Sequence, residues 1–254
     1  MNLEHMRREF WQNGYLALHD FFDPDLMDEI DRKIRAHFGD NPEFRHGQEF
    51  LNKSRTEVIP WFPQNPELPE YSLKTAIPFD RLEENERLKR LTAALLGDDW
   101  RPLYSMVMFS KKGTTGQAWH QDCPPENAGQ FNMNRLVYSR DLSEEIGGQT
   151  VVMPGSHRMG ELPVGEPHED LEGQVVLKPR KGTLVLLHGH TWHRVLPIKG
   201  EFRFSTNYRA CPAGTPANIT DICGELNRSM QHLASNIGEE DVAYEEISAK
   251  KTLL

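Results

Sequence analysis

The sequence has few cysteines and no long hydrophobic run. Its three cysteines, Cys123, Cys211 and Cys223, form no Cys-x-x-Cys pair. This spacing excludes a disulfide-stapled scaffold and a thiolate zinc cage. No apolar run approaches the roughly 18–20 residues of a membrane-spanning helix, and no apolar signal segment follows the charged N-terminal residues. We therefore expect a cytoplasmic globular protein that does not associate with a membrane.

Positive charge is also scarce. The chain has 29 Lys and Arg residues against 38 Asp and Glu residues, which gives a formal net charge of −9 over 254 residues. Duplex nucleic acid and anionic membranes attract proteins with a concentrated positive field, so we expect neither as a partner. Histidine is in mild surplus, with 11 residues, several of them close together.

The hydrophobic pattern divides the chain into a helical start, a β-rich middle and a helical end. We expect a helix that stops before Gly14, a strand over Tyr15–Leu18, a helix from Pro24 that Gly39 ends, and a helix over about 83–97. Short apolar segments separated by turn residues then indicate an antiparallel sandwich or barrel. These expected strands are Leu103–Phe109, Arg135–Arg140, Gln149–Met153, Gln174–Leu177, Thr183–Leu187 and Phe202–Arg209.

The chain is expected to form one domain. Residues 1–100 supply helical support, 101–210 the β-core, and 211–254 a last helical segment with an apolar face from Ile219 to Ile237. Residues 40–80 contain six prolines and little periodicity, and they are a candidate lid or substrate wall; the alternative is an ordered surface excursion.

Two histidine-containing segments in the β-rich part suggest a metal site. In Trp119-His120-Gln121-Asp122, an extended backbone would point His120 and Asp122 to the same side, so both can reach one ion. His188, His190 and His193 follow the strand that starts at Thr183. Imidazole is a common ligand of iron, zinc and copper, but the pattern alone does not choose among these three histidines.

Arg203 stands between Phe202 and Phe204 on an expected strand. If the arginine is the inward residue, it needs a carboxylate or phosphate partner, because an unpaired buried charge is costly. A guanidinium offers such an anion a bidentate fork, and Ser205 would lie on the same face. The alternatives are a structural ion pair or an arginine at an exposed edge.

Several motifs resemble those of the phytanoyl-CoA dioxygenase-like Fe(II)/2-oxoglutarate-dependent oxygenases. The motifs are Phe10–Leu16, Trp119–Asp122, Gly148–His157, which contains Pro-Gly-Ser-His, Gly182–Leu187, and a distal histidine ten residues before an arginine. The resemblance extends over roughly residues 8–210. It implies a mainly β protein with flanking helices around a double-stranded β-helix (jelly-roll, cupin-like) core.

The resemblance also implies a catalytic metal site of His120, Asp122 and His193 with Fe(II). His193 is preferred over His188 and His190 because the distal histidine of the family lies about ten residues before the arginine. Two histidines and one carboxylate form the facial triad of non-haem Fe(II) oxygenases, which leaves coordination positions open.

The resemblance assigns Arg203 to the C5 carboxylate of the co-substrate 2-oxoglutarate, with Ser205 assisting. Tyr138 and Met106 fall near positions that line the co-substrate pocket. The implied reaction consumes O2 and 2-oxoglutarate, releases succinate and CO2, and most simply hydroxylates a small organic molecule. Desaturation, epoxidation and ring formation stay open, and neither the substrate nor the oligomeric state follows from the sequence.

Two other classes of function compete with this interpretation. One is a cupin-type metalloprotein that holds another metal through the histidines of 188–193. The other is a catalytically silent binding or sensing protein of the same fold. Several cations are candidates for contact with an anionic substrate: Lys53, Arg55, Arg135, Arg194 and Arg209.

Overall fold

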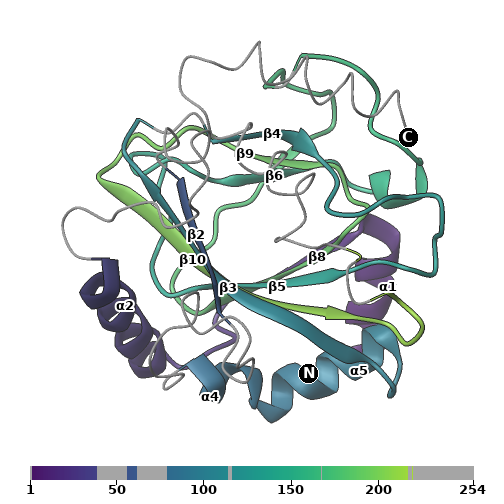
Figure 1. Cartoon of the computed structure of the whole chain (residues 1–254), viewed down its shortest axis with the longest axis horizontal. Helices are drawn as coiled ribbons and strands as arrows, with labels where there is room; N and C mark the ends of the chain where they lie inside the picture. Colours follow the sequence, from purple (N-terminus) through teal and green to yellow (C-terminus); the bar gives the residue numbers. More distant parts are fainter. Residues whose placement is uncertain are drawn as a thin grey trace.

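The computed structural model describes residues 2–38, 56–61, 79–113, 116–166, 168–216 and 219, and it contains two antiparallel sheets that face each other (Figure 1). The large sheet has the strand order β1-β8-β5-β10-β3-β2, and the small sheet the order β4-β9-β6-β7. The large sheet consists of β1 (Tyr15–Leu18), β2 (Thr56–Trp61), β3 (Arg101–Lys111), β5 (Met133–Tyr138), β8 (Thr183–His188) and β10 (Phe202–Cys211). The small sheet consists of β4 (Gln117–His120), β6 (Thr150–Val152), β7 (Val175–Val176) and β9 (His193–Val195).

Helices cover the face of the large sheet that points away from the small sheet (Figure 1). They are α1 (Leu3–Asn13), α2 (Pro24–Phe38), α4 (Phe79–Glu83) and α5 (Glu86–Leu96), and a short 3-10 turn follows at Ser156–Arg158. The expected mainly β jelly-roll core with flanking helices is confirmed. Among the described residues, no helix has the length and apolar character needed to cross a membrane.

Alternation along the strands divides the core into two layers. On β5, Val137 packs with the helices, whereas its neighbours Leu136 and Tyr138 pack toward the small sheet. Successive side chains of a strand point to opposite faces, and here both faces are covered, so every residue of β5 is buried. The second layer encloses the space in which the functional residues meet.

Local signals explain where the first helix begins and ends. The Asn2 side chain accepts a hydrogen bond from the backbone N–H of His5, at 3.1 Å, and caps the start of α1. Gly14 ends the helix in the left-handed conformation, with φ of 78°. A Cβ at this glycine would lie 2.4 Å from the Thr191 hydroxyl oxygen, so the sequence needs glycine where the chain passes the β8–β9 turn.

The observed elements differ from those expected in three places. The helix expected over about 83–97 is α5, which begins only at Glu86 because the Asn85 side chain accepts from the N–H of Leu88, at 3.1 Å, and caps its start; the short helix α4 before it was not expected. Strands β4 and β9 were not among the expected strands. Strand β2 lies inside the candidate lid of residues 40–80; most of that segment lies outside the described residues, as does the last helix expected up to Ile237.

Candidate metal centre and cavity

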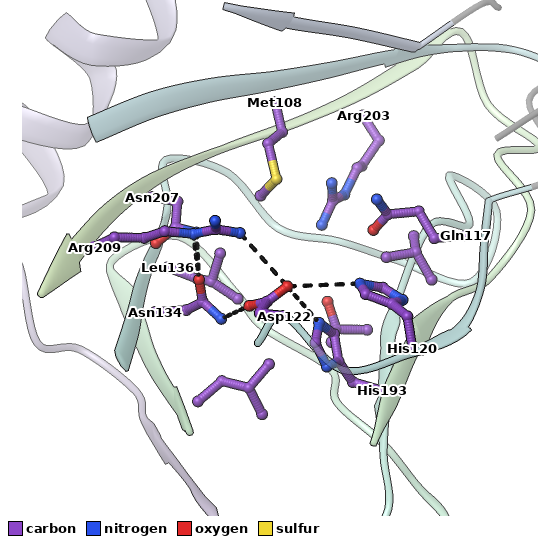
Figure 2. A pocket seen from close by; sticks show the side chains of 13 residues that line it. Met108, Gln117, His120, Asp122, Asn134, Leu136, His193, Arg203, Asn207 and Arg209 are labelled. Atoms are coloured by element: carbon purple, nitrogen blue, oxygen red, sulfur yellow. Dashed lines mark hydrogen bonds and ion pairs between the residues drawn. The ribbon is translucent and has the colours of Figure 1, made fainter. Parts of the chain in front are cut away.

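His120, Asp122 and His193 meet on the small sheet, at the edge of a cavity between the sheets (Figure 2). His120 ends β4 and His193 begins β9, and the antiparallel register places these two residues opposite each other. The Nε2 atoms of His120 and His193 lie 3.8 and 3.7 Å from Asp122 Oδ1. Within the described part of the chain, this is the only group of three or more metal-ligating side chains whose ligand atoms lie within 4.8 Å of one another.

Backbone carbonyls orient both imidazole rings. His120 Nδ1 lies 2.7 Å from the Ala118 carbonyl oxygen, and His193 Nδ1 lies 2.8 Å from that of Thr191. An Nδ1–H that donates to a carbonyl leaves the lone pair on Nε2, the atom that faces Asp122. The rings are therefore set to offer Nε2 to a metal.

The protonation states also suit a metal. Burial, followed by the nearby charge of His193, lowers the pKa of His120 to about 4. Burial by itself would raise the pKa of Asp122, but Arg209 and then the two histidines lower it below the ordinary range of a carboxyl group. Near neutral pH the site thus presents a neutral His120 and an ionised carboxylate, which are the forms that bind divalent cations.

The large sheet supplies the opposite wall of the cavity (Figure 2). Three polar side chains of β10 reach into it: Arg203, Asn207 and Arg209. The remaining lining is mostly apolar and comes from both sheets: Met108, Gln117, Asn134, Leu136, Thr150, Leu187 and Val195. A metal centre on one sheet therefore faces guanidinium groups on the other.

Arg203 is the inward residue of its strand. The side chain is 3% exposed, and its Nε is buried without a hydrogen-bond partner among the described residues. Gly148 makes room for the side chain, because a Cβ there would lie 3.0 Å from Arg203 Cγ. A buried cation of this kind calls for an anion. Ser205, two residues along β10, is also buried, and its hydroxyl has no partner in the described structure.

Tyr138 and Met106 are buried but do not line the cavity. The Tyr138 hydroxyl lies 3.2 Å from the hydroxyl of Thr150, which does line it. On β3 the lining residue is Met108 rather than Met106. Both methionines share one strand face, because they lie two residues apart on β3.

His188 and His190 lie apart from the metal centre. The His188 ring stacks on Phe131, with ring centroids 3.8 Å apart, and also contacts Trp11. Burial, followed by the charges of neighbouring histidines, lowers the pKa of His188 to about 2. The structure thus brings His193, and neither of these two histidines, to His120 and Asp122.

Of the cations considered for an anionic substrate, only Arg209 lines the cavity. Arg135 donates to the Tyr208 carbonyl oxygen at 2.5 Å, and Arg194 pairs with Asp170. Lys53 and Arg55 lie outside the described residues.

Sequence reasoning missed Asn134 and Asn207. Together with Asn132, Asn134 forms a polar alternation at the start of a strand that ends in apolar and aromatic residues, and this pattern was the available signal.

Comparisons with known proteins agree with this architecture. The family model described as Phytanoyl-CoA dioxygenase (PhyH) matches residues 10–203. A solved structure of the epimerase SnoN in complex with Fe3+, alpha ketoglutarate and nogalamycin RO is 19% identical, with a TM-score of 0.63 over 94% of this chain and 96% of that chain. HygX from Streptomyces hygroscopicus, with nickel and 2-oxoglutarate bound, is 17% identical, with a TM-score of 0.64 over 83% of this chain and 87% of that chain. No curated protein matches the sequence.

Proposed function

Because the chain belongs to the phytanoyl-CoA dioxygenase family, we propose that it is a non-haem Fe(II)- and 2-oxoglutarate-dependent oxygenase that hydroxylates a small organic molecule. One observation carries this proposal: the triad of His120, Asp122 and His193 shares a cavity with Arg203, whose buried Nε has no hydrogen-bond partner among the described residues. Two imidazoles and one carboxylate suit Fe(II) and leave coordination positions for other ligands. Two solved structures support this assignment: that of SnoN contains Fe3+ and alpha ketoglutarate, and that of HygX contains nickel and 2-oxoglutarate.

In this proposal, His120, Asp122 and His193 hold the metal. Arg203 binds the C5 carboxylate of 2-oxoglutarate through its fork of N–H donors, and Ser205 on the same strand face assists. Leu136, with the other apolar lining residues, keeps water out of the space between metal and arginine. The oxidation of the substrate is the chemistry that bound iron, 2-oxoglutarate and O2 supply, with succinate and CO2 as products.

The substrate is proposed to be a small molecule. The SnoN structure contains nogalamycin RO, and another HygX structure contains hygromycin B. The cavity wall is mixed, with apolar Met108 and Val195 as well as polar Gln117.

Anaerobic spectroscopy tests the metal and co-substrate assignment. Addition of Fe(II) and 2-oxoglutarate to the protein should produce a weak visible charge-transfer band. His120→Ala, Asp122→Ala and His193→Ala should each abolish the band, whereas His190→Ala, outside the triad, should retain it. A parent protein without a band contradicts the proposal, and loss of the band in His190→Ala but not in His193→Ala moves the distal ligand.

A product assay tests the reaction. Candidate small molecules are screened for O2-dependent succinate formation, and the substrate-derived product is weighed by mass spectrometry. Hydroxylation adds one oxygen atom, whereas an epimerisation leaves the mass unchanged. A full requirement for Fe(II), 2-oxoglutarate and O2 excludes a cupin-type protein that works with another metal. Binding of a small molecule without any succinate would instead support a silent sensor.

A further inference from the structure

The two oxygens of Asp122 have different surroundings (Figure 2). Oδ1 faces the Nε2 atoms of both histidines and lies 3.5 Å from a terminal nitrogen of Arg209. Oδ2 accepts hydrogen bonds from the side-chain amides of Asn132, at 3.3 Å, and of Asn134. One oxygen therefore points to the metal position, and neutral donors hold the other.

The amide of Asn134 is itself held in one orientation. Its Oδ1 accepts from Asn207 Nδ2 at 2.8 Å and from Arg209 Nε at 2.9 Å. A side-chain amide has its acceptor on one arm and its donors on the other. Because two donors of β10 hold the oxygen of Asn134, its NH2 group must face Asp122.

The hydrogen-bond network around Asn134 is buried, so the loss of one of its hydrogen bonds has a large energetic cost. Asn134 and Asn207 are each 2% exposed, and Arg209 is 3% exposed. Water therefore cannot readily replace a lost amide donor, and hydrogen bonds to a charged acceptor are stronger than those between neutral groups.

A carboxylate can bind a metal through one oxygen or through both. If Asp122 used both, it would occupy one of the positions that the facial triad leaves open. We propose that Asn134, oriented by Asn207 and Arg209, is a positioning residue that restricts Asp122 to ligation through Oδ1 and thereby keeps the 2-oxoglutarate position open. This inference rests on the proposed function of the site.

The test separates metal binding from co-substrate binding. Ni(II), which can be used in air, is titrated into the purified protein by calorimetry, and 2-oxoglutarate is then titrated at saturating Ni(II). Asn134→Ala should bind Ni(II) within about threefold of the parent, because all three ligands remain. It should bind 2-oxoglutarate at least about tenfold more weakly, as expected for loss of a buried hydrogen bond of at least about 1.4 kcal/mol. Asn207→Ala should change the 2-oxoglutarate affinity in the same direction by a smaller factor.

Ser139→Ala is the matched control. Ser139 follows β5, is 3% exposed, and has a buried hydroxyl without a partner in the described residues. Its removal deletes a buried polar group outside the network and should leave both affinities unchanged. A crystal structure of Ni(II)-loaded Asn134→Ala should show two Asp122 oxygens on the metal, where the parent shows one.

Each outcome of the titrations decides something. If Asn134→Ala binds 2-oxoglutarate as tightly as the parent, or loses Ni(II) and 2-oxoglutarate affinity in equal proportion, the positioning role is wrong. If Asn134→Ala does not fold, Asn207→Ala decides by the same criterion. A parent protein that binds neither Ni(II) nor 2-oxoglutarate overturns the proposed function itself. A parent that binds both, with variants that bind both as tightly as the parent does, overturns only the positioning role of Asn134.

Discussion

Replacing Arg203 by methionine should leave the stability of the unliganded protein unchanged or raise it, and it should weaken co-substrate binding. The side chain is 3% exposed, and its Nε is buried without a partner in the described structure. An unsatisfied buried polar group costs about 1–3 kcal/mol, and methionine keeps the unbranched stem that packs beside Gly148. The free energy of unfolding of the unliganded protein should therefore stay unchanged or rise.

The affinity for 2-oxoglutarate should fall in the same variant. Truncation of one partner of a buried charge pair costs about 2–5 kcal/mol, because the other charge stays in a dry cavity. At about 1.4 kcal/mol per factor of ten, the dissociation constant should rise about 30- to 4000-fold. The affinity for the metal should change little, since Arg203 contacts none of the three ligands.

Arg135→Met is the matched comparison. Arg135 is buried like Arg203, but its guanidinium donates to the Tyr208 carbonyl oxygen and to the Thr92 hydroxyl and pairs with Glu83 at 3.8 Å, although one terminal nitrogen has no hydrogen-bond partner among the described residues. Its loss should lower the free energy of unfolding by about 1–3 kcal/mol and leave the 2-oxoglutarate affinity of the folded protein unchanged. Urea unfolding and calorimetry measure both quantities. If Arg203→Met is less stable than the parent but binds 2-oxoglutarate as tightly, Arg203 is a structural residue and its role as the co-substrate anchor is refuted.

Three further predictions concern pH, backbone geometry and metal removal. His188 has a folded-state pKa of about 2, below its ordinary value, so this residue is protonated near pH 6.5 in the unfolded chain but stays neutral in the folded chain. The free energy of unfolding should therefore fall by about 2 kcal/mol between pH 6.5 and 5. His188→Asn should reduce this loss in urea titrations at the two pH values, and an unchanged loss contradicts it. Gly14→Ala should lower the free energy of unfolding by more than Gly160→Ala does. Both glycines have a positive φ, but of the two only Gly14 would bring a Cβ against another group, the Thr191 hydroxyl oxygen, at 2.4 Å. Gly160→Ala should lower the free energy of unfolding by only about 1–2 kcal/mol, and equal losses in the two variants would argue against the close approach at Gly14. A divalent metal at 100 times its dissociation constant should raise the free energy of unfolding by about 2.7 kcal/mol. Addition of a chelator, or the substitution His193→Ala, should abolish both this stabilisation and tight 2-oxoglutarate binding. Metal stabilisation that survives in His193→Ala would place the metal elsewhere.

Capping residues and apolar runs predicted the helices and strands whose conformation depends on their own local sequence. Helix α1 begins at a capping asparagine and ends at Gly14, and β8 contains a run of four apolar residues between Thr183 and His188. Strands β4 and β9 have four and three residues and carry the polar side chains of the site, so neither shows an apolar run. They become strands through their pairing with each other, which depends on contacts between distant parts of the chain.

The same distinction applies to the site. The spacing of His120 and Asp122 is local, and the interval from His193 to Arg203 matched a family motif, so these residues were accessible from the sequence. The hydrogen bond from Asn207 to Asn134 joins residues 73 positions apart. It exists because β5 and β10 pair in one register, and no local pattern contains that information. Residues that we propose to bind a ligand directly were thus easier to predict than those that we propose to orient them.

The acidic composition and the cationic cavity are consistent with each other under the proposed function. The net charge of −9 gives no surface attraction for polyanions, yet Arg203 and Arg209 both reach the cavity, with Asp122 as the carboxylate of the metal centre. Without a metal, Asp122 and Arg209 lie 3.5 Å apart and largely offset each other's charge, so Arg203 is the main anchor for an anion. A divalent cation supplies a second positive anchor, and 2-oxoglutarate carries two carboxylates. The dianion can then use both anchors only after the metal has bound, which is why removal of the metal should also abolish tight co-substrate binding.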